Sequence, residues 1–155
     1  MTSRYFTPDE SHWMELAIQH AWQAYERGEV PVGAVIVQEN RLIAADGNRR
    51  EEWNDPTAHA EIVVMRAASQ VLGSWRLAKC HLFVTLEPCL MCGGAIIGAR
   101  IPRLYYGCHD PAYGAVSLYQ MCMDSRLNHA VDTRTGLMEA QCREPLERFF
   151  QQKRQ

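Results

Sequence analysis

The sequence predicts an α/β fold, in which helices cover both faces of a sheet, within a single domain spanning residues 1–155. Two observations support this interpretation. At two places a β-rich run leads into a segment whose apolar residues recur at helical spacing, as in βα units. The length of 155 residues, with 47% hydrophobic and 22% charged residues, is ordinary for one globular domain that needs no covalent cross-links.

The N-terminal half is predicted to form a helix, a hairpin and a second helix. Thr7, Pro8 and Glu10 form a capping box at the start of the first helix, and Gly28 ends it. A hairpin is predicted where two β-rich runs flank a turn, and a helix where apolar residues recur three and four apart. The elements after Gly28 are strands at 32–37 and 41–45, a polar turn segment at 49–57 and a helix at 59–72.

The C-terminal half is predicted to alternate strands and helices. Pro88 cannot continue a strand but suits the entrance of a helix, so a buried strand ends before it. Gly93 and Gly94 weaken the helix that follows by about 1 kcal/mol each, and close backbone packing is a plausible reason. The predicted elements are strands at 82–84, 103–107 and 131–133, a short helix at 118–123 and helices at 89–99 and 138–152.

Charge and cysteine content exclude several classes of protein. A net charge of -2 gives no general attraction to nucleic acid, so any such binding must come from a local patch. Six cysteines without a secretory signal indicate reduced thiols in a cytoplasmic protein. No apolar run approaches the roughly 20 residues that a membrane span requires, so we expect no membrane association.

Three residues have the chemistry and spacing of a zinc site. Cys89 and Cys92 are three apart in the first turn of a predicted helix, so they share one face, and His59 begins another helix. One imidazole and two thiolates suit zinc, and three protein ligands leave the fourth tetrahedral position open, as in catalytic sites. Helix N-termini favour negative charge and help to keep such thiols ionised.

Glu61 follows His59 by two residues and is predicted to carry protons. Zinc can lower the pKa of a bound water from about 15.7 to near 7. A carboxylate beside that water can accept its proton and then deliver it to a ring nitrogen and to a leaving amine. This combination suits the hydrolytic loss of ammonia from an amidine-like carbon of a nucleobase.

Each motif alone also fits roles without catalysis. The His-x-Glu pattern occurs at ordinary helix starts, and Pro-Cys-x-x-Cys could be half of a structural zinc site, a redox pair or two core thiols. The two motifs together, each opening a helix in one small α/β domain, favour a catalytic site. The remaining cysteines, at positions 80, 108, 122 and 142, are predicted to be buried or incidental thiols. Four histidines are predicted to be solvated or to have their hydrogen bonds satisfied within the protein, at positions 12, 20, 81 and 129.

The two motifs together resemble the signature of the zinc-dependent cytidine/adenosine deaminase superfamily. Further stretches are similar to the bacterial tRNA-specific adenosine deaminases, and the similarity runs over nearly the whole chain, from about residue 8 to residue 154. These stretches are residues 30–35, 55–61, 75–77, 82–89 and 128–129, with the tail from Cys142 through Phe150.

The resemblance implies a three-layer α/β/α fold of the cytidine-deaminase type, with a mixed five-stranded sheet flanked by helices. It implies a homodimer with one Zn²⁺ per subunit that converts adenosine to inosine at wobble position 34, in the anticodon stem-loop of an arginine tRNA. The residues that match the family are His59, Cys89 and Cys92 as metal ligands, Glu61 as proton shuttle, Asn48 at the nucleoside sugar, Asp110 in a loop near the RNA, and Phe149 and Phe150 near the anticodon loop.

Simpler interpretations of the substrate-binding residues stay open. Asn48 could cap a turn, Asp110 could begin a turn or helix, and the two phenylalanines could belong to the core. The basic residues of the tail could meet RNA phosphates or could form a solvated helix face; they are Arg143, Arg148, Lys153 and Arg154. Gly93 stands where alanine is common in the family, and residues 111–113 and 119–121 look unusual, which leaves the RNA contacts and the accepted substrates open.

Two other functions compete with the tRNA deaminase. A small-molecule deaminase acting on guanine, cytosine or cytidine would use the same zinc chemistry, and the near-neutral charge favours it slightly. A zinc-stabilised RNA-binding module without catalysis would instead require a fourth protein ligand and no open position.

Overall fold

In the part of the chain that the structure describes, five strands form one mixed sheet. The computed structural model describes residues 6–153, and its strands lie in the order β2-β1-β3-β4-β5. β1 is antiparallel to β2 and β3, whereas β3, β4 and β5 run parallel to one another. The strands span Gly33–Gln38 (β1), Arg41–Gly47 (β2), Cys80–Leu86 (β3), Arg103–Cys108 (β4) and Asp132–Thr135 (β5). The mixed five-stranded sheet that the resemblance implies is confirmed.

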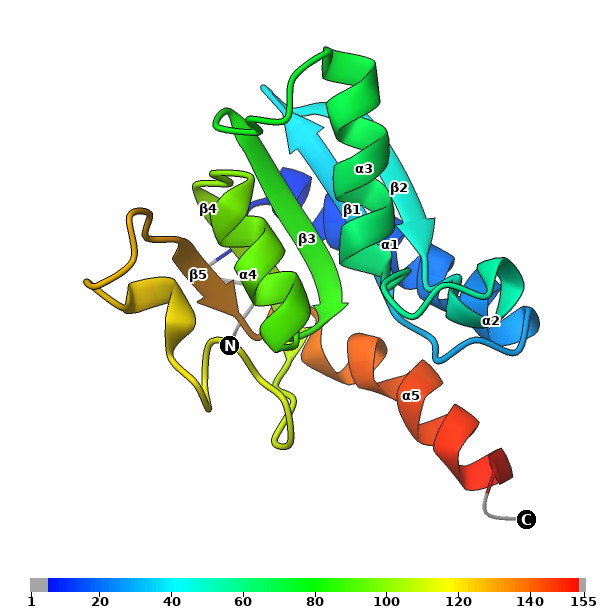
Figure 1. Cartoon of the computed structure of the whole chain (residues 1–155). Coiled ribbons are helices and arrows are strands. Elements are labelled where there is room, and N and C mark those ends of the chain that lie inside the picture. Colours follow the sequence, from blue (N-terminus) through cyan, green and yellow to red (C-terminus); the bar gives the residue numbers. More distant parts are fainter. Residues whose placement is uncertain (1–5, 154–155) are drawn as a thin grey trace.

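Helices cover both faces of this sheet, which confirms the three-layer α/β/α architecture. Figure 1 shows α3 and α4 in front of the sheet and α1 behind it. α5 packs against α1, β3 and β4, so it belongs to the rear layer. The helices span Pro8–Glu26 (α1), Arg50–Trp53 (α2), Ala60–Leu72 (α3), Leu90–Gly98 (α4) and Glu139–Lys153 (α5), with a 3-10 turn at Met121–Met123 (η2). Among residues 6–153, no helix combines the length and the apolar character needed to cross a membrane.

The start of α1 has the predicted capping box. The Thr7 hydroxyl accepts a hydrogen bond from the Glu10 amide at 3.1 Å, and the Glu10 carboxylate accepts one from the Thr7 amide at 2.7 Å. The helix buries Met14, Ala17 and Ile18 against the sheet, as their spacing predicts. Local capping and an apolar stripe therefore suffice to place this helix.

Two of the predicted segments were wrong. The polar segment 49–57 contains the short helix α2, because the buried Glu29 carboxylate accepts hydrogen bonds from the amides of Glu51 and Glu52, at 3.1 and 2.8 Å. The helix predicted at 118–123 is reduced to the turn η2. Gln120 has a φ of 52°, in the left-handed region, which a continuous right-handed helix cannot contain.

The adjacent glycines of α4 have different surroundings. A Cβ atom on Gly93 would lie 2.6 Å from the Cβ of Ala115, in the segment that follows β4. A Cβ atom on Gly94 would meet nothing within 4 Å. The close packing that the sequence suggested for these glycines is confirmed for Gly93 and is wrong for Gly94.

We expect opposite effects from alanine at these two positions. Gly94→Ala should raise the free energy of unfolding by about 0.5–1 kcal/mol, because alanine is the better helix former. Gly93→Ala should lower it by about 1–3 kcal/mol, because the new methyl group must displace Ala115. Urea unfolding of the two variants and the wild type measures both effects, and changes of the same sign would contradict this account.

Candidate functional site

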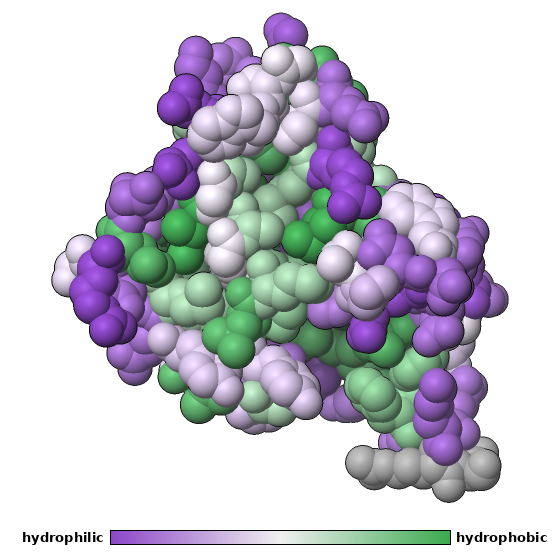
Figure 2. Space-filling view, in the orientation of Figure 1, coloured by the Kyte–Doolittle hydropathy of each residue, from purple (hydrophilic) through white to green (hydrophobic). Residues whose placement is uncertain are grey.

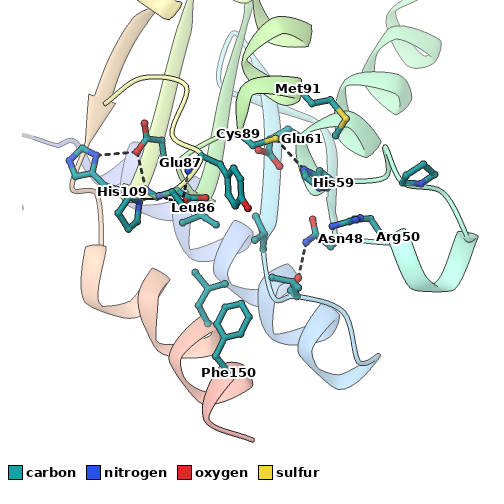
Figure 3. Close-up of a pocket in the computed structure, with 18 residues that line it drawn as sticks. Asn48, Arg50, His59, Glu61, Leu86, Glu87, Cys89, Met91, His109 and Phe150 are labelled. Carbon is teal, nitrogen blue, oxygen red and sulfur yellow. Dashed lines mark hydrogen bonds and ion pairs between the residues drawn. The ribbon is translucent and has the colours of Figure 1, made fainter. Parts of the chain in front are cut away.

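A cavity of about 690 Å³ lies at the edge of the sheet where β3 and β4 end. Its lining comes from the residues before β1 and after β2, the start of α3, the turn from β3 into α4, the loop after β4 and the end of α5 (Figure 3). This volume is typical of a small-molecule pocket. The carboxyl ends of parallel strands are also where open α/β sheets bind their ligands.

The three predicted metal ligands lie together; His59 and Cys89 line one side of this cavity, and Cys92 is buried beside them. The Nδ1 atom of His59 is 3.5 Å from the Sγ atom of Cys89 and 3.5 Å from that of Cys92. Zinc bonds of about 2.0–2.1 Å to nitrogen and 2.3 Å to sulfur, at a tetrahedral angle, would separate these atoms by about 3.5–3.6 Å. The donor set and its spacing therefore fit a zinc ion. Among residues 6–153, no fourth histidine, cysteine or carboxylate joins the group, so one coordination position would stay open.

The fold frees the His59 and Cys89 side chains for this task. Each residue is the N-cap of a helix, α3 or α4, yet neither side chain caps its own helix. The cap of α3 comes from the residue after β2, because the Asn48 side-chain oxygen accepts a hydrogen bond of 2.7 Å from the Ala60 amide. The pKa of Cys89 is lowered to about 3, first by a hydrogen bond from Cys92 and then by His59, so this ligand is ionised.

Glu61 lines the same cavity from the first turn of α3 (Figure 3). Its side chain is buried, with 4% of its surface exposed. Burial raises the pKa of this carboxyl to about 7, because it disfavours the charged form. A carboxyl group with such a pKa can both accept and donate a proton near neutral pH.

Asn48 contacts both the cavity and the backbone around it. Its side-chain nitrogen donates to the Val30 carbonyl at 2.9 Å, and its oxygen caps α3 as described above. One N–H and one oxygen lone pair remain for a ligand in the cavity. The capping interpretation of Asn48 is thus present in the structure, although the cap serves a helix rather than a turn.

The other predicted substrate-binding residues separate into two groups. Asp110 and Phe150 line the cavity. The Asp110 carboxylate also accepts hydrogen bonds from the amides of Ala112 and Tyr113, at 2.9 and 3.2 Å, and so begins a turn. Phe149 is buried and packs edge-on against Tyr25, with the ring centres 6.3 Å apart. It is not among the described residues that line the cavity.

The basic residues of the tail are largely engaged within the protein. Arg143 pairs with Glu139 at 2.6 Å, and Arg148 pairs with Glu144 at 3.2 Å, each one helical turn apart. The Arg148 guanidinium also lies over the Trp22 ring, and Lys153 lies over Phe149. These contacts support the interpretation that the basic residues of α5 form a solvated helix face, rather than a surface that meets RNA phosphates. Arg154 lies outside the described residues.

Sequence reasoning missed several residues of the cavity, among them Glu87 and Arg50. Glu87 directly follows β3 and is 1% exposed; its position two residues before a metal ligand was the available signal. Arg50 begins α2 and is exposed at the cavity. It had no signal in the sequence, because the helix that carries it depends on the distant Glu29.

Comparisons with known proteins identify the family of this chain. Residues 8–154 match the family described as MafB19-like deaminase. The chain is 51% identical over 147 residues to a tRNA-specific adenosine deaminase of Agrobacterium fabrum strain C58, covering 94% of this chain and 97% of the relative. These matches span nearly the whole described fold, not only the two motifs.

Solved structures give the same result. One of them comes from biochemical and structural studies of A-to-I editing by tRNA:A34 deaminases at the wobble position of transfer RNA. It has a TM-score of 0.85 and 52% identity to this chain, and the match covers 87% of this chain and 99% of that one. A guanine deaminase from Nitrosomonas europaea has a TM-score of 0.75 at 22% identity, covering 92% of this chain and 84% of that one, which shows the shared fold alone. Family model, relatives and site geometry agree, and the chain belongs to the MafB19-like deaminases and, among them, to the family of tRNA-specific adenosine deaminases.

Proposed function

We propose that this protein deaminates adenosine to inosine at wobble position 34 of a tRNA. The observation that carries the proposal is the buried Glu61 carboxyl, which lines one cavity with His59 and Cys89. These two residues form a three-donor group with Cys92. The relatives that share most of the chain's length are named for this reaction on tRNA.

In the proposed reaction, water replaces the exocyclic amine of the base. The metal ligands would be His59 Nδ1 and the Sγ atoms of Cys89 and Cys92. A zinc ion held there would supply the Lewis acidity that makes water a nucleophile near neutral pH. Glu61 takes a proton from the attacking water and passes it to the ring nitrogen beside the reacting carbon. Glu61 then moves the second water proton to the amine, which leaves as ammonia and yields inosine.

Phe150 and Phe149 should respond differently to truncation. Phe150 is 47% exposed and lines the cavity, so Phe150→Ala should remove a stacking surface for an RNA base. Such stacking is worth about 1–3 kcal/mol, which corresponds to an increase of about 5- to 150-fold in KM for a stem-loop. Phe149→Ala should instead lower the free energy of unfolding by about 3–5 kcal/mol, because it empties a buried position. Reversed effects in steady-state kinetics and urea unfolding would contradict this assignment.

The decisive experiment offers three substrates side by side. Purified protein is incubated with an anticodon stem-loop carrying adenosine 34, with free guanine and with cytidine, each with and without a zinc chelator. We expect inosine only in the stem-loop, and no product after chelation. Ammonia released only from guanine or cytidine would overturn the proposal.

A small-molecule deaminase is the second candidate function. It is supported by the net charge of -2 and by the ion pairs that engage Arg143 and Arg148 on α5. It would need no RNA surface, and the same zinc chemistry would serve it. The three-substrate experiment separates the two candidates directly.

A homodimer is proposed on the α3–α4 face. In Figure 2 the centre of this face is largely apolar and hydrophilic residues surround it. A groove there is lined by Ile62, Met65, Ala95 and Ala99 together with polar neighbours, and exposed apolar patches of this kind mark interaction surfaces. Light scattering would measure the oligomeric state. One zinc ion per subunit, an arginine tRNA and a cytoplasmic location are further predictions from the resemblance.

A further inference from the structure

Glu87 is a buried carboxylate that the proposed reaction does not use. It stands between the end of β3 and the metal ligand Cys89, and only 1% of its surface is exposed. Both of its oxygens accept several hydrogen bonds. The donors are the amides of Asp110 at 2.9 Å, Val116 at 3.0 Å and Ser117 at 2.6 Å, the Ser117 hydroxyl at 2.7 Å and the His109 ring at 3.3 Å.

All of these donors belong to one segment, residues 109–117, which follows β4. This segment has no regular secondary structure, yet residues 109–113 line the cavity. Figure 3 shows Glu87 and His109 joined on the side of the cavity opposite His59 and Asn48. The Ala115 amide adds a bond of 2.9 Å to the Pro88 carbonyl. Glu87 and Pro88 therefore attach this wall of the cavity to the turn between β3 and α4.

Gly114 shows how closely the segment fits the carboxylate. A Cβ atom at Gly114 would lie 2.5–2.6 Å from the carboxyl carbon and both oxygens of Glu87. Only a residue without a side chain allows this approach. The segment is therefore wrapped around the carboxylate group, with no space between them.

The contacts of Glu87 match a carboxylate. Backbone amides, a hydroxyl and an imidazole ring converge on its two oxygens, and an ionised carboxylate only accepts hydrogen bonds. A charged acceptor makes stronger hydrogen bonds than a neutral one. The segment is thus held by charge-assisted bonds.

We propose that Glu87 is a positioning residue that shapes the substrate-binding wall of the cavity. It fixes residues 109–117 relative to the turn that carries Cys89, so that Asp110 and Tyr113 occupy their places before the substrate arrives. Binding to a preformed wall avoids the cost of ordering a loop at that moment. This inference rests on the proposed function, because it assigns the wall to the anticodon stem-loop.

Glu87→Gln is the first test, since the amide keeps the size of the side chain. The NH₂ group of the new glutamine would face backbone amides whose hydrogen bonds the carboxylate oxygens accept in the wild type. Two donors cannot bond to each other, so the segment should loosen. Losing hydrogen bonds to a charged group weakens the hold on the segment and so weakens substrate binding. We therefore expect KM for the adenosine-34 stem-loop to rise about 10- to 100-fold, with kcat changing less. Zinc content should stay at the wild-type value, and the amides of Asp110, Val116 and Ser117 should exchange hydrogen faster.

Two further variants separate positioning from general stability. Gly114→Ala leaves Glu87 intact but forces the segment away from it, so it should reproduce the increase in KM. Ile18→Ala destabilises the protein from α1, away from the cavity, and should leave KM unchanged below its unfolding temperature. Gly114→Ala also keeps the inference testable if Glu87→Gln does not fold.

Three results would overturn the inference. These are a wild-type KM in both cavity variants, an equal increase in KM for Ile18→Ala, and unchanged hydrogen exchange at the three amides. A failure of the proposed function is distinguishable, because the wild-type protein itself would then form no inosine in the stem-loop. In that case hydrogen exchange still measures whether Glu87 holds the wall.

Discussion

Replacing Glu61 with alanine is expected to lower inosine formation by about 10²- to 10⁴-fold, the usual contribution of a positioned general acid and base. The side chain is buried in the cavity, close to His59, Cys89 and Cys92. The other buried carboxyl group of the cavity, Glu87, is taken up by hydrogen bonds from the segment after β4. Removal of the Glu61 carboxyl leaves the three zinc donors untouched. Folding and zinc content should therefore stay at wild-type values while turnover is lost.

The experiment measures inosine by mass spectrometry, bound zinc by elemental analysis and folding by circular dichroism. Glu15→Ala is the matched control, because Glu15 lies on the exposed side of α1, away from the cavity. It should keep full activity. If Glu61→Ala retained wild-type activity, Glu61 would have no part in the reaction. If the variant lost its fold, the role of Glu61 would be structural.

The grouping of the three proposed zinc donors, and the place of Glu61 beside them, could be predicted because local patterns in the sequence determine much of it. His59 and Cys89 each begin a helix, and Cys92 follows one turn later, so secondary structure alone orients them. The capping box of α1 is local in the same way. Predictions of this kind need only the spacing of residues within about one turn.

The parts that sequence reasoning missed depend on contacts between distant residues. Glu29 builds α2 through amides more than twenty residues away, and Asn48 caps α3 from the end of β2. The acceptor role of Glu87 becomes visible only when the segment after β4 is placed against it. No local pattern encodes these pairings.

The two phenylalanines of α5 illustrate the same limit. Consecutive residues on a helix point about 100° apart, so one of Phe149 and Phe150 had to face inward more than the other. Which one does so depends on how α5 packs against α1. The structure places Phe149 against Tyr25 and leaves Phe150 at the cavity.

Cys92→Ser is expected to abolish both zinc binding and deamination. Cys92 is fully buried and supplies one of two thiolates, and a serine hydroxyl is not among the ligands that zinc prefers. Activity should fall to the level of chelator-treated wild-type protein. Added zinc should restore the chelated wild type but not the variant, because only the wild type still has all three donors.

Cys122→Ser provides the matched control for this result. Cys122 is buried to the same degree, at 1% exposure, but it lies outside the three-donor group, so its variant should keep both zinc and activity.

Alkylation gives an independent measurement. Cys89 is the half-buried thiol among six free cysteines, whereas the other five are buried. Iodoacetamide should therefore modify Cys89 first, and only after zinc is removed, because a thiolate bound to the metal is not free to react. Equal modification with and without a chelator, or full activity in protein that contains no metal, would show that the three donors do not hold a catalytic ion.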